Sequence, residues 1–162
     1  MAWRQVLDAF DVLDSAVADG ARVTELLRRS GVEDVSTARI EGPRGSTDFV
    51  KALIRGSRGK SSGGEAPTLG IIGRLGGLGA RPERIGFVSD GDGALAAVTC
   101  ATKLGAMQRN GDILAGDVIV ATHICPNAPT QPHDPVPFMG SPVDMAEMNR
   151  HEVDEGMDAI LS

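Results

Sequence analysis

The feature that most constrains the fold is the order of apolar segments in the second half of the chain. Short, almost wholly apolar runs at residues 68–72, 85–88 and 118–121 predict three strands, and residues 94–109 carry apolar side chains at helical spacing. Strands this apolar are buried on both faces, and a helical crossover is the connection that parallel strands need. The expected fold class is therefore α/β, a mixed or parallel sheet with helices on both faces.

The first half adds helices and strands to the same single domain, residues 1–162. Residues 22–29 predict a helix, and residues 32–40 and 49–54 predict strands that complete an N-terminal part, residues 1–54. Residues 55–67 carry no apolar side chain except Ala66 and predict a flexible loop before the site-bearing half, residues 68–162. An amphipathic helix that ends near residues 19–20 is predicted from apolar side chains at three- to four-residue spacing: Trp3, Val6, Leu7, Phe10, Leu13 and Val17.

The C-terminal part is proline-rich and then regular again. Six prolines fall between residues 125 and 142, which predicts an ordered loop or an arm. Residues 143–151 predict a last helix, and residues 159–161 read as the start of a strand. We therefore expect the sheet to be incomplete without a further chain segment.

Composition and charge exclude several classes of function. Aromatic residues make up 3% of the chain, so the core must be aliphatic, and the two cysteines form no C-x-x-C pair, which indicates a reducing compartment. Residues 84–162 hold 11 acidic against 4 basic side chains, which disfavours nucleic acid as a partner. No signal peptide and no apolar run long enough for a membrane span are evident, so we expect a cytoplasmic protein with no membrane partner.

Polar residues that suit a cation site follow two of the predicted strands. Asp90 and Asp92 lie between a strand and a helix, where ligands of α/β sheets bind, although a capping aspartate in a tight turn is the alternative. His123 ends the next strand and His133 follows in the same loop. Aspartate and histidine together suit zinc or another divalent metal, so Asp90, His123 and His133 are the candidate metal ligands.

Two further segments are candidates for substrate binding or catalysis. The glycine-rich residues 73–84 include Gly76 and Gly77, which leave backbone accessible, and Arg74, whose guanidinium suits a substrate carboxylate. A turn-rich connection explains them equally well. Cys125 is a weaker candidate nucleophile because no helix N-terminus lowers its pKa. A solvated helix face is the simpler explanation for three polar residues near the C-terminus: Asp144, Glu147 and His151.

Residues 87–121, FVSDGDGALAAVTCATKLGAMQRNGDILAGDVIVA, resemble the co-catalytic zinc aminopeptidase and deacylase superfamily. The resemblance implies a hydrolase in which Asp90 matches the aspartate that bridges two zinc ions. Arg74 stands where that superfamily has a metal histidine, and its paired glutamates fall near Pro126 and Asn127, which implies a rearranged or single-metal site. We assign Asn127 to the substrate-binding set.

The whole chain also resembles an uncharacterised bacterial family, through GSTDF, APTLGIIGRLGG, SDGDGA and THICPNAP. The first functional hypothesis is cleavage of an amide bond in a small peptide or N-acyl amino acid by a metal-activated water, with Asp92 and His123 catalytic. The second is a self-cleaved amidase whose amino-terminal nucleophile begins a second chain after Ser162. The third is a non-catalytic ligand-binding or assembly module. A second chain fragment or a homo-oligomer is the expected macromolecular partner.

Overall fold

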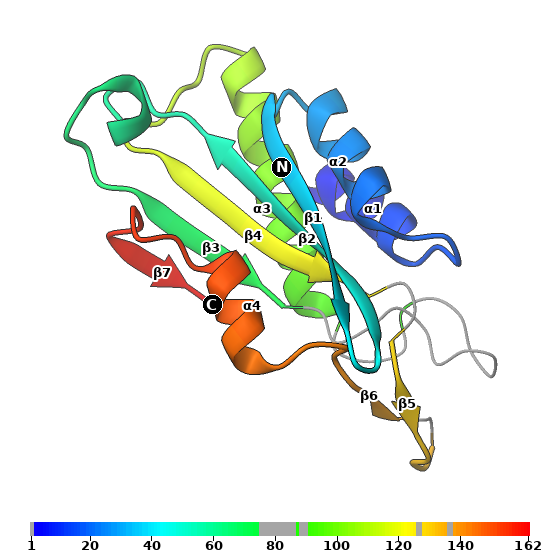
Figure 1. Ribbon diagram of the computed structural model, residues 1–162. Coiled ribbons are helices and arrows are strands. Elements are labelled where there is room, and N and C mark those ends of the chain that lie inside the picture. Colours follow the sequence, from blue (N-terminus) through cyan, green and yellow to red (C-terminus); the bar gives the residue numbers. More distant parts are fainter. Residues whose placement is uncertain (1, 75–86, 88–90, 126–127, 136–137) are drawn as a thin grey trace.

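The computed structural model describes all residues except 1, 75–86, 88–90, 126–127 and 136–137 (Figure 1). The elements in chain order are α1 (Trp3–Leu13), α2 (Gly20–Arg29), β1 (Asp34–Gly42), β2 (Gly45–Ile54), a short 3-10 helix (Lys60–Ser62), β3 (Leu69–Gly73), α3 (Asp92–Arg109), β4 (Val118–Ile124), β5 (Thr130–Gln131), β6 (Phe138–Met139), α4 (Met145–Glu152) and β7 (Ala159–Leu161).

Five strands form one open mixed sheet in the order β1-β2-β4-β3-β7. β1 and β2 make an antiparallel hairpin, and β2 also pairs antiparallel with β4. β3 lies parallel to β4 on one side and to β7 on the other, with α3 in the connection from β3 to β4. The predicted α/β class and mixed sheet are therefore confirmed. The predicted strand at residues 85–88 lies outside the described residues except for Phe87, which is in a bend.

The helices lie on both faces of the sheet, as expected (Figure 1). α1, α2 and α3 cover one face, and the main core lies between them and the sheet. Its fully buried members are aliphatic, as the scarcity of aromatic residues predicts. α4 lies on the opposite face, where a smaller cluster joins Phe49 of β2 to Val143 and Met148. β7 is at the sheet edge with its three residues exposed.

The first helix is shorter than predicted and buries only part of the predicted apolar stripe. α1 ends at Leu13, and Asp19 begins α2 instead of ending α1, because its carboxylate accepts a hydrogen bond from the Arg22 amide at 2.9 Å. Aspartate is a preferred residue at this N-terminal capping position. Ala9 and Leu13 are buried against the core, so Leu13 is a buried member of the predicted stripe. Four other members of the stripe are exposed: Trp3, Leu7, Phe10 and Val17.

The segment predicted to be a flexible loop, residues 55–67, contains the 3-10 helix and donates hydrogen bonds to Asp117. The Asp117 carboxylate accepts hydrogen bonds from the Gly56 and Ser61 amides, both at 2.8 Å, and from the Ser61 hydroxyl. Burial would raise the pKa of Asp117, but these hydrogen bonds hold it below its ordinary value. One buried carboxylate just before β4 thus gives the segment a defined path.

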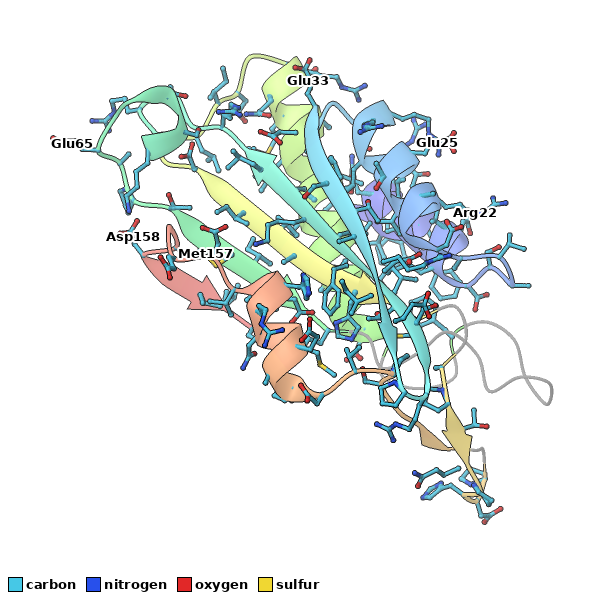
Figure 2. All side chains as sticks on the ribbon, in the orientation of Figure 1. Arg22, Glu25, Glu33, Glu65, Met157 and Asp158 are labelled. Atoms are coloured by element: carbon cyan, nitrogen blue, oxygen red, sulfur yellow. The ribbon has the colours of Figure 1, made fainter. Side chains whose placement is uncertain are left out.

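The connection from α4 to β7 is hydrogen-bonded to residues at the same end of the sheet. Asp158 accepts hydrogen bonds from the Thr68 amide and from the Lys60 ammonium group, both at 2.7 Å. Figure 2 shows Asp158 and Met157 beside the start of β7. Met157 lies over Gly70 of β3, where an added Cβ would come within 2.4 Å of its sulfur. The C-terminal strand is thus anchored by packing and by a shared carboxylate.

β3 and α3 approach each other closely where two glycines meet. A Cβ on Gly73 would lie 1.9 Å from the carbonyl oxygen of Gly93, and a Cβ on Gly93 would lie 2.5 Å from that of Arg74. Such separations are impossible for a real side chain, so glycine is required here for backbone contact. These two glycines join the end of a strand to the start of a helix and fix the direction in which Arg74 leaves β3.

Candidate functional site

A buried network of three charged or ionisable side chains lies between the sheet and α4. His123 Nδ1 and Glu152 Oε1 are 2.5 Å apart, and Arg74 Nε donates to Glu152 Oε2 at 2.6 Å. The Glu152 side chain has no exposed surface, and His123 is 1% exposed. Each oxygen of the Glu152 carboxylate is therefore bound by a different side chain. We refer to Arg74, His123 and Glu152 as the buried network.

The sheet register brings the first two members of the network together. Gly73 of β3 pairs with Thr122 of β4, so Arg74 and His123 are the next residues along two parallel strands. Side chains alternate between the faces of a sheet, and His123 lies on the face away from α3. α4 covers that face and supplies Glu152 from its last position. The network thus stands at the carboxyl ends of parallel strands, where α/β proteins usually bind ligands.

The electrostatics of the network favour an ionised Glu152. Burial alone would raise the pKa of this carboxyl group, because desolvation disfavours charge. The hydrogen bond and charge of His123, followed by those of Arg74, outweigh the burial and hold the pKa of Glu152 below its ordinary value of 4.5. A buried carboxylate is stable only when its oxygens are paired in this way. The ionised Glu152 carboxylate can thus accept a hydrogen bond from His123 when Nδ1 of that ring carries a proton.

Further side chains of α4 and β2 surround the network. The Arg74 guanidinium also donates to Asn149 Oδ1 and contacts Met145, so it spans the inner side of α4. Phe49 lies between two histidines, with ring centroids 5.4 Å from His123 and 4.6 Å from His151. Beside it is a hollow of about 250 Å³. Its lining comes from β1, β2 and α4: Ser36, Thr37, Ala38, Phe49, Lys51, Arg150 and His151.

A second histidine and glutamate pair lies on α4 near the first. His151 Nε2 and Glu147 Oε1 are 2.9 Å apart, and Arg150 donates to the other oxygen of Glu147 at 2.5 Å. Both side chains of the pair are a quarter exposed, in contrast to the buried network. The pair is local to one helix, at i and i+4. Asp144, which the sequence places on the same face, is the N-terminal capping residue of α4, and its carboxylate accepts a hydrogen bond from the Glu147 amide at 2.8 Å.

Comparison with known proteins identifies the family. Residues 38–162 match the model of the family described as "Protein of unknown function (DUF1177)". The chain belongs to the DUF1177 family. A search of curated proteins finds no match.

Two solved structures resemble the chain distantly. One is titled "Bottromycin maturation enzyme BotP", with 18% identity, a TM-score of 0.49, and coverage of 76% of this chain and 29% of the other. The second is a mutant of tomato leucine aminopeptidase, with 14% identity, a TM-score of 0.49, and coverage of 78% and 27%. The chain spans less than a third of the length of either protein.

Of the residues that the sequence singles out, the structure of this DUF1177 member brings Arg74 and His123 together on Glu152. Asp92 is the first residue of α3 and is exposed. His133 is exposed between β5 and β6, in a different environment from the buried His123. The other predicted site residues lie outside the described residues: Gly76, Gly77, Asp90 and Asn127.

Glu152, the residue that joins the network, was not singled out in the sequence. The signal for it is its spacing from Met148, because residues four apart share a helix face. Met148 is buried and Glu152 is buried beside it, so the apolar face of α4 contains a carboxylate. A charged residue within an apolar helix face indicates a buried partner of opposite charge. Glu152 has two such partners: His123 of β4 lies 29 residues earlier in the sequence, and Arg74, just after β3, lies 78 residues earlier.

The described residues do not supply a metal site. No group of three or more histidine, cysteine, aspartate or glutamate side chains outside the gaps could hold an ion. In the network, both oxygens of Glu152 are bound and the guanidinium of Arg74 lies beside them, which opposes a cation. The predicted zinc ligands therefore do not form a cluster in this part of the chain, and Asp90 lies outside it.

Cys125 is not placed as a nucleophile. Its side chain is fully buried after β4, and its sulfur contacts the Thr47 hydroxyl at 3.2 Å. Burial raises the pKa of the Cys125 thiol to about 11, so it stays protonated at neutral pH.

In the ranges that the structure covers, no helix is long and apolar enough to cross a membrane.

Proposed function

We propose that this chain contributes an active site to a hydrolase that cleaves an amide bond in a small peptide or an N-acyl amino acid. The observation that carries the proposal is the buried pair of His123 and Glu152 at the carboxyl end of β4. An ionised carboxylate on one ring nitrogen is the arrangement that orients a histidine for proton transfer. A structural anchor for α4 is the competing explanation.

His123 would act as the base and then as the acid. With the proton on Nδ1 held by Glu152, Nε2 carries a lone pair that accepts a proton from a water molecule. That water oxygen forms a bond to the amide carbonyl carbon, and the carbon–nitrogen bond then breaks. Nε2 returns the proton to the departing amine, which leaves a carboxylic acid and an amine as products. Because His123 is covered by α4, the proposal requires the earlier part of α4 to move when a substrate binds, while Glu152 at its last position stays on Nδ1.

Arg74 would bind the carboxylate of the substrate. Three of its five N–H groups are directed to Glu152, Asn149 and Met145. Its side chain is 31% exposed, so the remaining N–H groups can meet a ligand from solvent. A guanidinium that is already fixed by Glu152 loses little conformational freedom when it binds a second carboxylate. This favours substrates with a free carboxylate near the amide bond.

A divalent metal is not required by the residues described, and no step above depends on one. The resemblance of residues 87–121 to a zinc-dependent superfamily leaves Asp90 as the proposed ligand. Metal analysis of the purified protein tests this directly, with Asp90→Asn as the control. Stoichiometric metal that is lost in Asp90→Asn supports a metal-dependent hydrolase with Asp90 as a ligand. A metal-free protein that retains activity excludes metal dependence.

The experiment that tests the hydrolase proposal measures amine release from a panel of dipeptides and N-acetyl amino acids. His123→Asn should abolish turnover, whereas His151→Asn should retain it, because His151 belongs to the partly exposed pair on α4 and its ring is hydrogen-bonded to Glu147, not to Glu152 or Arg74. Circular dichroism confirms that both variants are folded. If no substrate of the panel is cleaved, or if folded His123→Asn remains active, the proposal is wrong and the network only anchors α4.

A further inference from the structure

The outer face of α1 carries large apolar side chains that the fold leaves exposed. Trp3 is 69% exposed, Leu7 48% and Phe10 38%. Their spacing of four and three residues places them in one stripe along the helix. On the side of α1 that packs on α2 and α3, the two buried apolar residues are Ala9 and Leu13. α1 therefore turns its largest apolar residues away from its own core.

A stripe of this kind differs from scattered surface hydrophobics. Single exposed apolar residues are common, but contiguous patches mark interaction surfaces. Phe10 is also stacked on Phe87, with ring centroids 5.3 Å apart, and the Phe87 amide donates to the Asp14 carboxylate at 2.6 Å. These contacts hold one end of the stripe in place. A preformed apolar stripe binds a partner with a smaller entropic cost than a mobile one.

The charges beside the stripe are divided along the helix. Arg4 lies near the N-terminus of α1, and Asp8 and Asp11 lie further along, all on the same flank of the stripe at 100° per residue. Arg4 and Asp8 are 3.7 Å apart in an exposed pair that contributes little to stability. One flank of the stripe is therefore positive at one end and negative at the other.

We propose that the stripe binds α1 of a second copy of this chain, antiparallel, about a two-fold axis at Leu7. With a rise of about 1.5 Å per residue, Trp3 and Phe10 lie about 6 Å and 4.5 Å from Leu7 in opposite directions along the helix. The axis then packs Trp3 on Phe10 of the partner subunit and Leu7 on Leu7 of the partner subunit. Such an interface is self-complementary, as two-fold symmetry demands.

The charge pattern selects this occupant and this direction. The two-fold axis keeps the charged flanks of both helices on the same side, so Arg4 lies beside Asp11 of the partner subunit, and the contact occurs twice. The same axis brings Asp8 near Asp8 of the partner subunit once, and each of these is paired with Arg4 of its own helix. A parallel two-fold pairing would instead place the charged flanks on opposite sides of the interface, so Arg4 could not meet Asp11 of the partner subunit. An anionic membrane is disfavoured because acidic residues outnumber basic ones on α1. The inference concerns α1, which precedes the residues matched by the family model, and it does not depend on the hydrolase proposal.

Sedimentation velocity over a concentration series tests the association. The series runs from about 1 to 200 µM, which spans the affinities of small interfaces. The native chain should shift from monomer to dimer. Leu7→Glu should raise the dimer Kd at least about tenfold, whereas Ile113→Glu, a matched control at a 50% exposed site outside α1, should leave it unchanged. A monomer at every concentration, or a dimer that Leu7→Glu does not weaken, overturns the proposal.

Charge reversal tests the direction of pairing. Arg4→Asp and Asp11→Arg should each raise the dimer Kd several-fold, because each creates two like-charge contacts across the axis. The double variant R4D/D11R restores opposite charges and should return the Kd to near the native value. Circular dichroism and the urea midpoint confirm that every variant is folded. A double variant that binds no more tightly than the singles overturns the antiparallel arrangement.

Discussion

Replacement of Glu152 by glutamine tests how the buried network contributes to stability. The substitution keeps the shape of the side chain but removes the charge that both His123 and Arg74 contact. Breaking a buried ion pair by changing one partner costs about 3–5 kcal/mol. Glutamine retains some hydrogen bonding, so we expect a loss of about 2–4 kcal/mol in the free energy of unfolding. For a domain of this size, that corresponds to a decrease of roughly 5–15 °C in Tm.

The matched control is Glu147→Gln on the same helix. Glu147 also contacts a histidine and an arginine, but its side chain is a quarter exposed. Exposed pairs are worth about 0–1 kcal/mol, so this variant should lose less than about 1 kcal/mol. Urea unfolding followed by circular dichroism measures both. If the two variants are destabilised equally, the buried network does not contribute more than the exposed pair, and the reasoning is refuted.

The pH dependence of the same comparison gives an independent check. The folded-state pKa of Glu152 is lowered, so its ionised form stabilises the folded chain at pH values above its ordinary pKa of 4.5. This contribution is lost as the pH falls below 4.5 and through the folded-state pKa. The difference in stability between the native chain and Glu152→Gln should therefore shrink as the pH falls. A difference that stays constant from neutral to acidic pH would show that the charge of Glu152 is not its cause.

Three further outcomes follow from the fold. Asp117→Asn should cost about 1–3 kcal/mol and make residues 55–67 more susceptible to limited proteolysis, because it weakens three hydrogen bonds; unchanged cleavage would contradict this. Cys125 should react with a thiol reagent only after unfolding, since it is buried with its pKa raised to about 11; rapid labelling of Cys125 in the folded chain, mapped by mass spectrometry, would disprove its burial. Gly73→Ala should cost at least about 1–3 kcal/mol in thermal unfolding, whereas Gly140→Ala, with its nearest atom 3.7 Å away, should be neutral; equal effects would argue against the close approach of β3 and α3.

The fold class was predictable because its signals are local. The apolar runs that became β3 and β4 and the helical spacing of α3 are each contained in fewer than 20 residues. The face that α1 buries was not predictable in the same way. Its hydrophobic stripe was clear, but Leu13 of that stripe packs into the core beside Ala9 while Trp3 stays outside. Periodicity identifies a stripe and does not say whether the chain itself or a partner covers it.

The site was predicted in part for a similar reason. Arg74 and His123 stand at strand ends, a position that topology marks as functional. Their contact through Glu152 depends on how α4 crosses the sheet, which no local pattern encodes. Asp92 and His133 have the chemistry expected of a site but are exposed outside the network. Residue type thus identified candidates, and tertiary packing decided which of them meet.

The position of β4 has a consequence for the order of folding. The β1–β2 hairpin pairs residues that are close in sequence, and such contacts form fast because little chain entropy is lost. β4 then has to bring together β2, more than 60 residues before it, and β3, from which α3 separates it. Because closing a loop of this length costs more chain entropy than forming a hairpin, we expect the docking of β4 to be slower than formation of the hairpin. In this order of events the hairpin is the template on which β4 docks, and we expect the hydrogen bonds from Gly56 and Ser61 to Asp117 to form with that docking.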